Sequence, residues 1–476
     1  MTQSVESLTE IKLLPRKTRK FILQQYGITY RKEYSMNKIS NAVEKHRRLI
    51  LDAERYIWNN PETGYKEIKT SKYLEDAFEN LGYKITRAEG ITGFYTVIDT
   101  GREGPEVLVL GELDSVICPS HKDADPVTGA VHSCGHNAQS ATLLGIAAAL
   151  TEEGILDGLC GRIRLCTVPA EELLEIEFRK ELKKQGKIKY LGGKSEFLYR
   201  GYFDGVDIAF MVHTAPGYGC NAGSVGCIAK NMIYKGVAAH AGGSPWDGKN
   251  ALYAANCGIN AVNALRETFK DADLIRFHPI ITHGGDMVNA IPERVQMESY
   301  VRGKTYDAIV KNNEKINRAL IGAALSMGTN IEIIDIPGYA PLVNDKNMIQ
   351  VAADAAKEVG IDFNPDGHIS SGSTDMGDLS TIMPVVHPYS GGSVGTGHGK
   401  DFYIADPEAA CITNAKWQIC MLKILLENNA ERAKRVISEY KPLFASKEEF
   451  LAFQDSLNTC GDRIIYKDGN IAEAKL

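Results

Sequence analysis

The sequence predicts an α/β protein, with an open mixed sheet covered by helices and a second, ferredoxin-like α+β domain inserted into it. The first observation behind this is a series of apolar runs without alternation, typical of strands buried on both faces. The second is a change of pattern between residues 227 and 336, where the order becomes β-α-β-β-α-β. The third is the length of 476 residues, which is too long for one ordinary core.

The elements of the main domain follow from these patterns in chain order. Helical periodicity and turn residues predict helices at Lys45 to Asn59 and Lys69 to Leu81. The apolar runs predict six strands, at Tyr83 to Arg87, Gly93 to Asp99, Glu106 to Gly111, Arg162 to Val168, Val206 to Val212 and Met383 to His387. Further helices are expected at Ala138 to Leu150, Met348 to Val359 and Glu408 to Asn428. Together these elements predict an open sheet with helices on both faces.

The inserted segment has its own alternation of strands and helices. We expect strands at Cys227 to Lys235, Phe277 to Thr282, Val295 to Val301 and Asn330 to Ile336, and helices at Asn250 to Phe269 and Tyr306 to Met327. Both crossings between the domains are expected at glycines, Gly226 and Gly338. No internal repeat is found.

Composition excludes several classes of function. Hydrophobic residues make up 44% and charged residues 24%, and the net charge is -6, so there is no basic field for nucleic acid. No apolar stretch of the length of a signal peptide or a membrane span is found. The ten cysteines form no close pairs, which indicates reduced thiols in a cytoplasmic protein.

A metal site is predicted around His132-Ser133-Cys134-Gly135-His136-Asn137, which precedes a helix of small and apolar residues. A thiolate and an imidazole two positions apart on a turn can bind one or two divalent metals. The remaining ligands are expected at the carboxyl ends of the strands, because sites in open α/β sheets collect there.

Acidic or imidazole residues follow four of the predicted strands. The candidates at these strand ends are Glu112 and Asp114, Glu171 and Glu172, His213, and His398 in a glycine-rich loop. Cys134, His136, one of the two glutamates, His213 and His398 form a nitrogen, oxygen and sulfur set suited to zinc or manganese. Adjacent glutamates point in different directions, so one can bind metal while the other faces a water. The residues alone do not decide which, nor whether Asp114 orients a histidine or only ends its strand.

The order of several motifs resembles a known family. They are His132-Ser133-Cys134-Gly135-His136, Pro169-Ala170-Glu171-Glu172, Phe203-Asp204-Gly205-Val206-Asp207, Lys235-Gly236-Val237-Ala238-Ala239-His240-Ala241 and Asn289-Ala290-Ile291-Pro292-Glu293-Arg294-Val295. Together they resemble the metal-dependent amidohydrolases, which include N-acyl-amino-acid and aminobenzoyl-glutamate hydrolases. Aminoacylase and glutamate carboxypeptidase are more distant relatives. The resemblance runs from about residue 45 to 425.

The resemblance implies a two-metal catalytic domain interrupted by a lid domain through which chains often dimerise. It assigns two Zn or Mn ions to Cys134, His136, Glu172, His213 and His398. It makes Glu171 the general base, lets His240 polarise the scissile carbonyl from a partner chain, and has Asn289 contact substrate. The expected boundaries are an N-terminal extension at 1–35, catalytic parts at 36–226 and 339–476, and the lid at 227–338.

Three departures from the family pattern stand out. Asn137 replaces the usual aspartate after His136, which resembles the aminobenzoyl-glutamate branch; Asn137 and Asp114 are expected behind the metal ligands. Residues Leu173 to Leu191 form an insertion, rich in Lys and Glu, next to Glu172. The loop of His398 is richer in glycine than is usual.

The function expected from these features is hydrolysis of the amide bond of an N-acyl or N-aroyl amino acid by a metal-activated water, with Glu171 as general base. The expected partners are a small amide substrate and a second copy bound through the lid. One alternative is a metallo-dipeptidase or carboxypeptidase. Another is a non-catalytic partner subunit that kept the fold.

Overall fold

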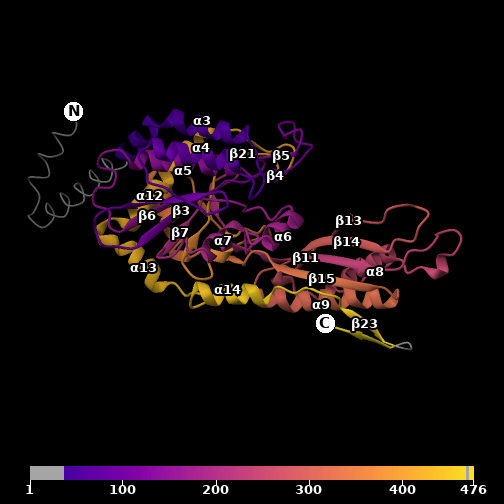
Figure 1. Cartoon of the computed structure of the whole chain (residues 1–476). Helices are drawn as coiled ribbons and strands as arrows, with labels where there is room; N and C mark the ends of the chain where they lie inside the picture. The colour runs from indigo at the N-terminus through magenta and orange to yellow at the C-terminus, as the bar shows by residue number, and fades with distance from the viewer. Residues whose placement is uncertain (1–36, 468–470, 476) are drawn as a thin grey trace, which may run out of the picture.

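The computed structural model describes residues 37–467 and 471–475, so the predicted N-terminal extension at 1–35 lies outside the described residues. Figure 1 shows an α/β body from which a β-sheet with two helices projects. The described part of the chain contains no helix long and apolar enough to cross a membrane.

The body is built on a six-stranded mixed sheet in the order β1-β2-β6-β3-β7-β19. Its strands are β1 (Thr86–Arg87), β2 (Phe94–Asp99), β3 (Glu106–Glu112), β6 (Arg162–Val168), β7 (Ile208–Phe210) and β19 (Val385–Val386). The strands from β6 to β19 are parallel, whereas β1 and β2 run antiparallel to their neighbours. Because parallel strands end at one edge, the loops after β3, β6 and β7 meet there.

Both faces of this sheet are covered by helices, as predicted. Along β3, Val107 and Val109 pack on one face while Leu108 and Leu110 pack on the other. The first face is covered by α3 (Arg47–Trp58), α4 (Ile68–Asn80), α5 (His136–Leu150), α10 (Lys346–Glu358), α12 (Asn414–Leu426) and α13 (Glu431–Glu439). The second face is covered by α7 (Gly193–Tyr199), α11 (Met376–Leu379) and α14 (Lys447–Ser456). Burial on both faces explains the absence of apolar alternation.

The differences from the predicted elements occur mainly at the sheet edges. β6 and β2 match their predictions closely, whereas the runs predicted as Tyr83 to Arg87 and Met383 to His387 pair over two residues each. β1 and β19 are the edge strands and have a neighbour on one side only. The predicted C-terminal helix begins with a π-helical turn, Glu408–Thr413, before α12.

Short strands shape the loops around the end of the sheet. They are β4 (Val116–Ile117), β5 (Ala130–Val131), β8 (His213–Thr214), β9 (Gly219–Cys220), β10 (Gly223–Ser224), β16 (Leu342–Val343), β17 (Asn364–Pro365), β18 (Ile369–Ser370), β20 (Tyr389–Ser390), β21 (Ser393–Val394) and β22 (Tyr403–Ile404). They form the small sheets β16-β10-β18 and β17-β9-β20-β8 and the pairs β4-β5 and β21-β22.

The projecting part, here called the inserted unit, comprises residues 226–337. It contains β11 (Gly226–Lys235), α8 (Ala251–Ala264), β12 (Arg276–Phe277), β13 (Ile280–His283), β14 (Arg294–Gly303), α9 (Tyr306–Ser326) and β15 (Asn330–Pro337). Its antiparallel sheet has the order β12-β14-β11-β15, with β13 also paired to β14. The expected β-α-β-β-α-β order is present, although the strand predicted at Phe277 to Thr282 is two pieces and α8 ends earlier than predicted.

The chain enters and leaves the inserted unit at one place. The backbone N–H of Cys227 donates to the carbonyl of Tyr339 at 2.8 Å, and that of Gly338 donates to the carbonyl of Cys227 at 3.1 Å. After α14 the chain returns to the edge strand β15, where Thr459 bridges Asp335, and ends in the hairpin β23 (Ile464–Lys467) and β24 (Ile471–Ala474) (Figure 1). The residue boundaries of the domains stay a prediction.

Candidate active site

The turn that carries Cys134 and His136 depends on the glycine between them. Gly135 has φ +86°, and a Cβ at this position would meet Thr214 Oγ1 at 2.1 Å. An L side chain rarely adopts this φ, so glycine is required here. The turn places Cys134 just before α5 and makes His136 the first residue of the helix.

The predicted ligands from four separate segments converge in the structure. Cys134 Sγ lies 3.3 Å from His213 Nε2, and His398 Nε2 lies 2.9 Å from Glu172 Oε1. Among the described residues, three groups of donor atoms have their members within 4.8 Å of one another, and two of them consist of predicted ligands alone: Cys134 with His136 and His213, and Cys134 with Glu172 and His398. Both groups include Cys134, an arrangement that suits two neighbouring ions.

The chemistry of these donors fits divalent metal. Nδ1 of His136 lies 2.9 Å from the carbonyl oxygen of Asp114, and Nδ1 of His213 lies 2.8 Å from that of Thr214. Such contacts fix the ring and leave Nε2 to face an ion. Nε2 of the buried His136 makes no hydrogen bond among the described residues. Asp114 Oδ2 also accepts from the backbone N–H of Glu172 at 2.9 Å, so Asp114 contacts two candidate ligands rather than only ending β3.

The two glutamates sit on a constrained turn after β6. Ala170 has φ +55°, and a Cβ on Gly193 would meet the carbonyl oxygen of Pro169 at 1.7 Å. Tyr339 donates its hydroxyl to the carbonyl of Glu171. The turn directs the carboxylate of Glu172 toward His398, while that of Glu171 lies near His136 and Glu112. Adjacent side chains thus take different positions.

Glu171 lies in an environment that favours its protonated form. The carboxyl is buried, and no Lys or Arg among the described residues forms an ion pair with it. Burial raises its pKa well above the usual value, and the negative charges of Glu112 and Glu172 raise it further. A carboxyl group whose pKa is raised is better able to accept a proton and return it during a reaction.

The candidate ligands shift one another's pKa values. Burial opposes ionisation of the Cys134 thiol, but nearby His136 and His213 outweigh it and lower its pKa to about 6. Hydrogen bonding to Cys134 and Glu172 raises the pKa of His398 to about 11. Burial also opposes ionisation of Glu172, yet His398 lowers its pKa to about 2.

A buried lysine beneath the site was not foreseen from the sequence. Lys194 is fully buried; its Nζ donates to Glu112 Oε1 at 2.6 Å and to Asp375. Glu112 Oε2 in turn lies 3.2 Å from His136 Nε2. Asp375 accepts from the backbone N–H of Lys194 at 2.9 Å and also binds the side chain of Lys194. In the sequence, the one sign of this cluster was Glu112 at the end of a predicted strand.

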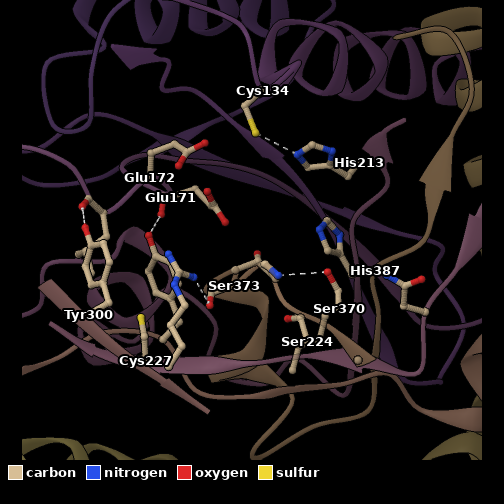
Figure 2. Close-up of a pocket in the computed structure, with 18 of the residues that line it drawn as sticks. Cys134, Glu171, Glu172, His213, Ser224, Cys227, Tyr300, Ser370, Ser373 and His387 are labelled. Atoms are coloured by element: carbon tan, nitrogen blue, oxygen red, sulfur yellow. Dashed lines mark hydrogen bonds between the residues drawn. The ribbon is translucent and has the colours of Figure 1, made fainter. Parts of the chain in front are cut away.

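A cavity of about 360 Å³ opens beside the ligand groups. Figure 2 shows Cys134, His213, Glu171 and Glu172 at one end, with Tyr300 and Ser373 farther along. Arg302 of β14 is the sole Lys or Arg among the described residues that line it. Its Nη1 donates to Ser373 Oγ at 2.6 Å, and no described carboxylate pairs with it. The cavity therefore offers a cation for an anionic group of a ligand.

Three predicted site residues lie elsewhere. His240 and Asn289 are not among the described residues lining the cavity; His240 is exposed on the inserted unit, where its Nδ1 accepts from Gly243 N at 2.9 Å. Asn137 donates to Glu54 Oε1 at 2.8 Å instead of contacting His136. Within one chain these residues do not join the ligand groups.

Comparison with known proteins agrees with this geometry. The sequence profile of Peptidase family M20/M25/M40 matches residues 108–419. The chain belongs to this family. It is therefore a metal-dependent hydrolase acting on amide bonds of acyl-amino acids or dipeptides. The resemblance seen in the sequence is confirmed.

Several members of the M20 family are similar to this chain. The Xaa-Arg dipeptidase of Mus musculus is 28% identical over 370 residues, covering 75% of this chain and 79% of that protein. One of the subunits of the p-aminobenzoyl-glutamate hydrolase of Escherichia coli is 27% identical over 303 residues, covering 62% and 59%. A Bacillus subtilis structure, described as a dinuclear metal-binding peptidase of the M20 family, has a TM-score of 0.60 and 20% identity over 80% of this chain and 99% of that one.

Proposed function

We propose that this M20 protein hydrolyses the amide bond of an N-acyl or N-aroyl amino acid and releases the free amino acid. The observation that carries the proposal is the unpaired, buried carboxyl of Glu171 beside two groups of metal-binding side chains. Each component of the site has a separate role in the reaction.

The proposed ligands of two divalent ions, Zn or Mn, are Cys134, His136, Glu172, His213 and His398. Ions bound there would lower the pKa of a water molecule and polarise the scissile carbonyl. The donor set is mixed in nitrogen, oxygen and sulfur, which favours these borderline metals over calcium or magnesium.

Glu171 is proposed to move the proton. Its raised pKa suits a group that accepts a proton from the attacking water and gives it to the departing amide nitrogen. Burial of Glu171 and of its neighbour Glu112 keeps bulk water away from this transfer.

Arg302 is proposed to bind the α-carboxylate of the amino acid that is released. A guanidinium pairs with a carboxylate through two parallel hydrogen bonds, and here the cation has no protein carboxylate among the described residues to occupy it. The same cavity is lined by Arg302 and by candidate metal ligands. This assignment favours substrates that carry a free carboxylate next to the cleaved bond.

A homodimer through the inserted unit is part of the proposal. Exposed large apolar side chains of this unit lie on its two long loops, at the start of α8 and on β13: Trp246, Tyr253, Ile280, Ile281, Met287 and Val288. Exposed apolar side chains that form a contiguous patch indicate a protein interface. Because His240 and Asn289 lie on the same loops and away from their own cavity, they would reach the site of a partner subunit.

The second candidate is a metallo-dipeptidase, favoured by the similarity to the Xaa-Arg dipeptidases. A dipeptide brings a free ammonium group, which needs a carboxylate partner. The carboxylates among the described cavity residues are Glu171 and Glu172, which already have the roles above. The cavity therefore supports an uncharged acyl group better than a free amino end.

A hydrolysis panel separates these candidates. The metal-loaded protein is offered N-acetyl, N-benzoyl and N-aminobenzoyl amino acids alongside matched dipeptides, with metal content measured on the same sample. The proposal expects turnover of the acyl and aroyl compounds. Turnover of dipeptides alone would favour the second candidate, and metal binding without turnover would favour a non-catalytic partner subunit.

The ten cysteines, all in the described ranges, form no disulfide bonds, which supports a reducing cytoplasmic location.

A further inference from the structure

One side chain of the insertion, residues 173–191, donates hydrogen bonds to backbone carbonyls at both ends of the insertion. Arg179 of α6 (Ile176–Lys184) is 1% exposed. Its Nη1 donates to the carbonyl of Leu191 at 2.8 Å, and its Nη2 donates to the carbonyl of Glu172. These carbonyls mark the points where the insertion leaves and rejoins the α/β body. Glu172 is a candidate metal ligand. Arg179 therefore holds the backbone of a residue that is expected to bind metal.

The environment of Arg179 is unusual for a buried cation. No carboxylate among the described residues forms an ion pair with it, and its Nε has no hydrogen-bond partner there. The guanidinium carbon lies 5.6 Å from the ring centroid of Tyr65. Burying a charge is costly unless it is paired or well hydrogen bonded. The two carbonyls therefore supply much of the compensation, and one of them belongs to Glu172.

The insertion also covers one face of the sheet of the inserted unit. An apolar cluster joins the two, formed by Leu173, Ile176, Ile188 and Leu191 together with Cys227, Ala229, Ile336 and Tyr339. Polar contacts add to it, because Glu177 Oε1 accepts from Asn231 Nδ2 of β11 at 2.7 Å. The α8 and α9 helices cover the opposite face. The insertion is thus packed between the body and the inserted unit.

One contact connects the insertion to the cavity wall. Tyr300 of β14 donates its hydroxyl to the carbonyl of Leu173 at 2.5 Å, and its ring lies 5.2 Å from the guanidinium of Arg302 (Figure 2 shows this wall). Leu173 follows Glu172 directly in the chain. A path of direct contacts therefore runs from Arg302 through Tyr300 and Leu173 to Glu172.

We propose that the insertion couples the carboxylate-binding Arg302 to the metal-binding Glu172, and that Arg179 is a positioning residue for Glu172. Arg179 is not among the described residues that line the cavity; it fixes the backbone from which the Glu172 side chain reaches the ligand group. Tyr300 fixes the next residue from the side of the inserted unit. This inference rests on the proposed function for the role of Arg302, whereas the effect on metal binding can be measured without any substrate.

The test is Zn²⁺ titration of the metal-free full-length protein and its variants. Arg179→Met removes both hydrogen bonds; Lys184→Met is the control, because Lys184 is an exposed cation on the same helix. We expect Arg179→Met to bind Zn²⁺ about 10–100-fold more weakly, the usual cost of losing an outer partner of a ligand. Arg179→Lys, which can reach one carbonyl, should recover part of the affinity. Lys184→Met should bind as the unmodified protein does.

Folding is checked in the same samples by circular dichroism and thermal unfolding. A folded Arg179→Met variant with unchanged Zn²⁺ affinity would overturn the proposal. If that variant does not fold, Tyr300→Phe decides, since it deletes one hydroxyl: weaker Zn²⁺ binding supports the coupling and unchanged binding refutes it. With an active substrate, Tyr300→Phe should also raise KM for an acyl-amino acid more than for its carboxamide. Absence of any turnover by the unmodified protein would count against the proposed function, while the Zn²⁺ comparison would still judge Arg179.

Discussion

Nε2 of His398 lies 2.9 Å from Oε1 of Glu172, which joins a glycine-rich loop late in the chain to the turn after β6. The loop is held there because the backbone N–H of His398 donates to the carbonyl of Ser133 at 2.8 Å. His398, whose loop departs from the usual family context, is thus brought to the same place as Cys134 and Glu172.

This pair predicts that metal binding releases a proton. The pKa of His398 is raised to about 11 in the metal-free chain, so its imidazole is protonated throughout pH 6–8. A ligand histidine must be neutral, so Zn²⁺ affinity should rise with pH, about tenfold per unit for each proton released. Calorimetric titration in two buffers of different ionisation enthalpy measures the release. His398→Asn should release one proton fewer, and heats that do not depend on the buffer would contradict this prediction.

Lys194 is expected to be essential for stability as well as for the metal site. Lys194→Met leaves Glu112 and Asp375 buried without their cation, which should cost about 3–5 kcal/mol of unfolding free energy. Zn²⁺ affinity should also fall, because Glu112 lies beside His136. The matched control is Lys230→Met, since Lys230 is a buried lysine paired with Asp335 in the inserted unit. Urea unfolding should show a comparable loss for both variants, and Zn²⁺ titration a loss for Lys194→Met alone. Equal Zn²⁺ affinities in the two variants would contradict the role given to this lysine.

Arg302 should govern recognition of the carboxylate. Arg302→Met is expected to raise KM for an N-acyl amino acid by about 10–100-fold, because a charge-assisted pair contributes roughly 1.5–3 kcal/mol. For the corresponding amino-acid amide, the KM of this variant should equal that of the unmodified enzyme. Steady-state kinetics on the two substrates gives the comparison; equal effects on both would show that Arg302 does not bind the carboxylate.

His240 should act on the site of the other subunit. Glu171→Gln and His240→Ala chains are each expected to be nearly inactive alone. A mixed dimer contains one site with an intact Glu171 that receives His240 from the partner, so activity should return when the chains are co-expressed with different tags and purified through both. Sedimentation confirms the dimer. No recovery in a verified mixed dimer would place His240 outside catalysis between subunits.

The sequence was informative where local chemistry decides the structure. Arg162 to Val168 matches β6 because burial on both faces leaves an unbroken apolar run. The ligand groups could be anticipated because the ends of parallel strands share an edge and loops can reach it. The choice of Glu172 over Glu171 came from the family resemblance and stays a prediction; in the structure Glu172 Oε1 lies 2.9 Å from His398 Nε2.

Other features depend on contacts between distant parts of the chain. Lys194 pairs with residues on β3 and just before α11, and a lysine after two glycines gives no sign of burial. Arg179 lies in an insertion rich in Lys and Glu, yet it is buried and donates to two carbonyls at the two ends of the insertion. Arg302 belongs to an alternating strand of the inserted unit, so nothing in its local pattern links it to the cavity.

The central claim is that Glu171 is the general base of a metal-dependent amide hydrolysis. Glu171→Gln preserves the shape of the side chain but removes its ability to accept a proton. With the metal content verified as equal to that of the unmodified protein, we predict that kcat on an N-acyl amino acid falls by about 10²–10⁴-fold. A metal-replete Glu171→Gln enzyme that keeps its hydrolytic rate would contradict the account.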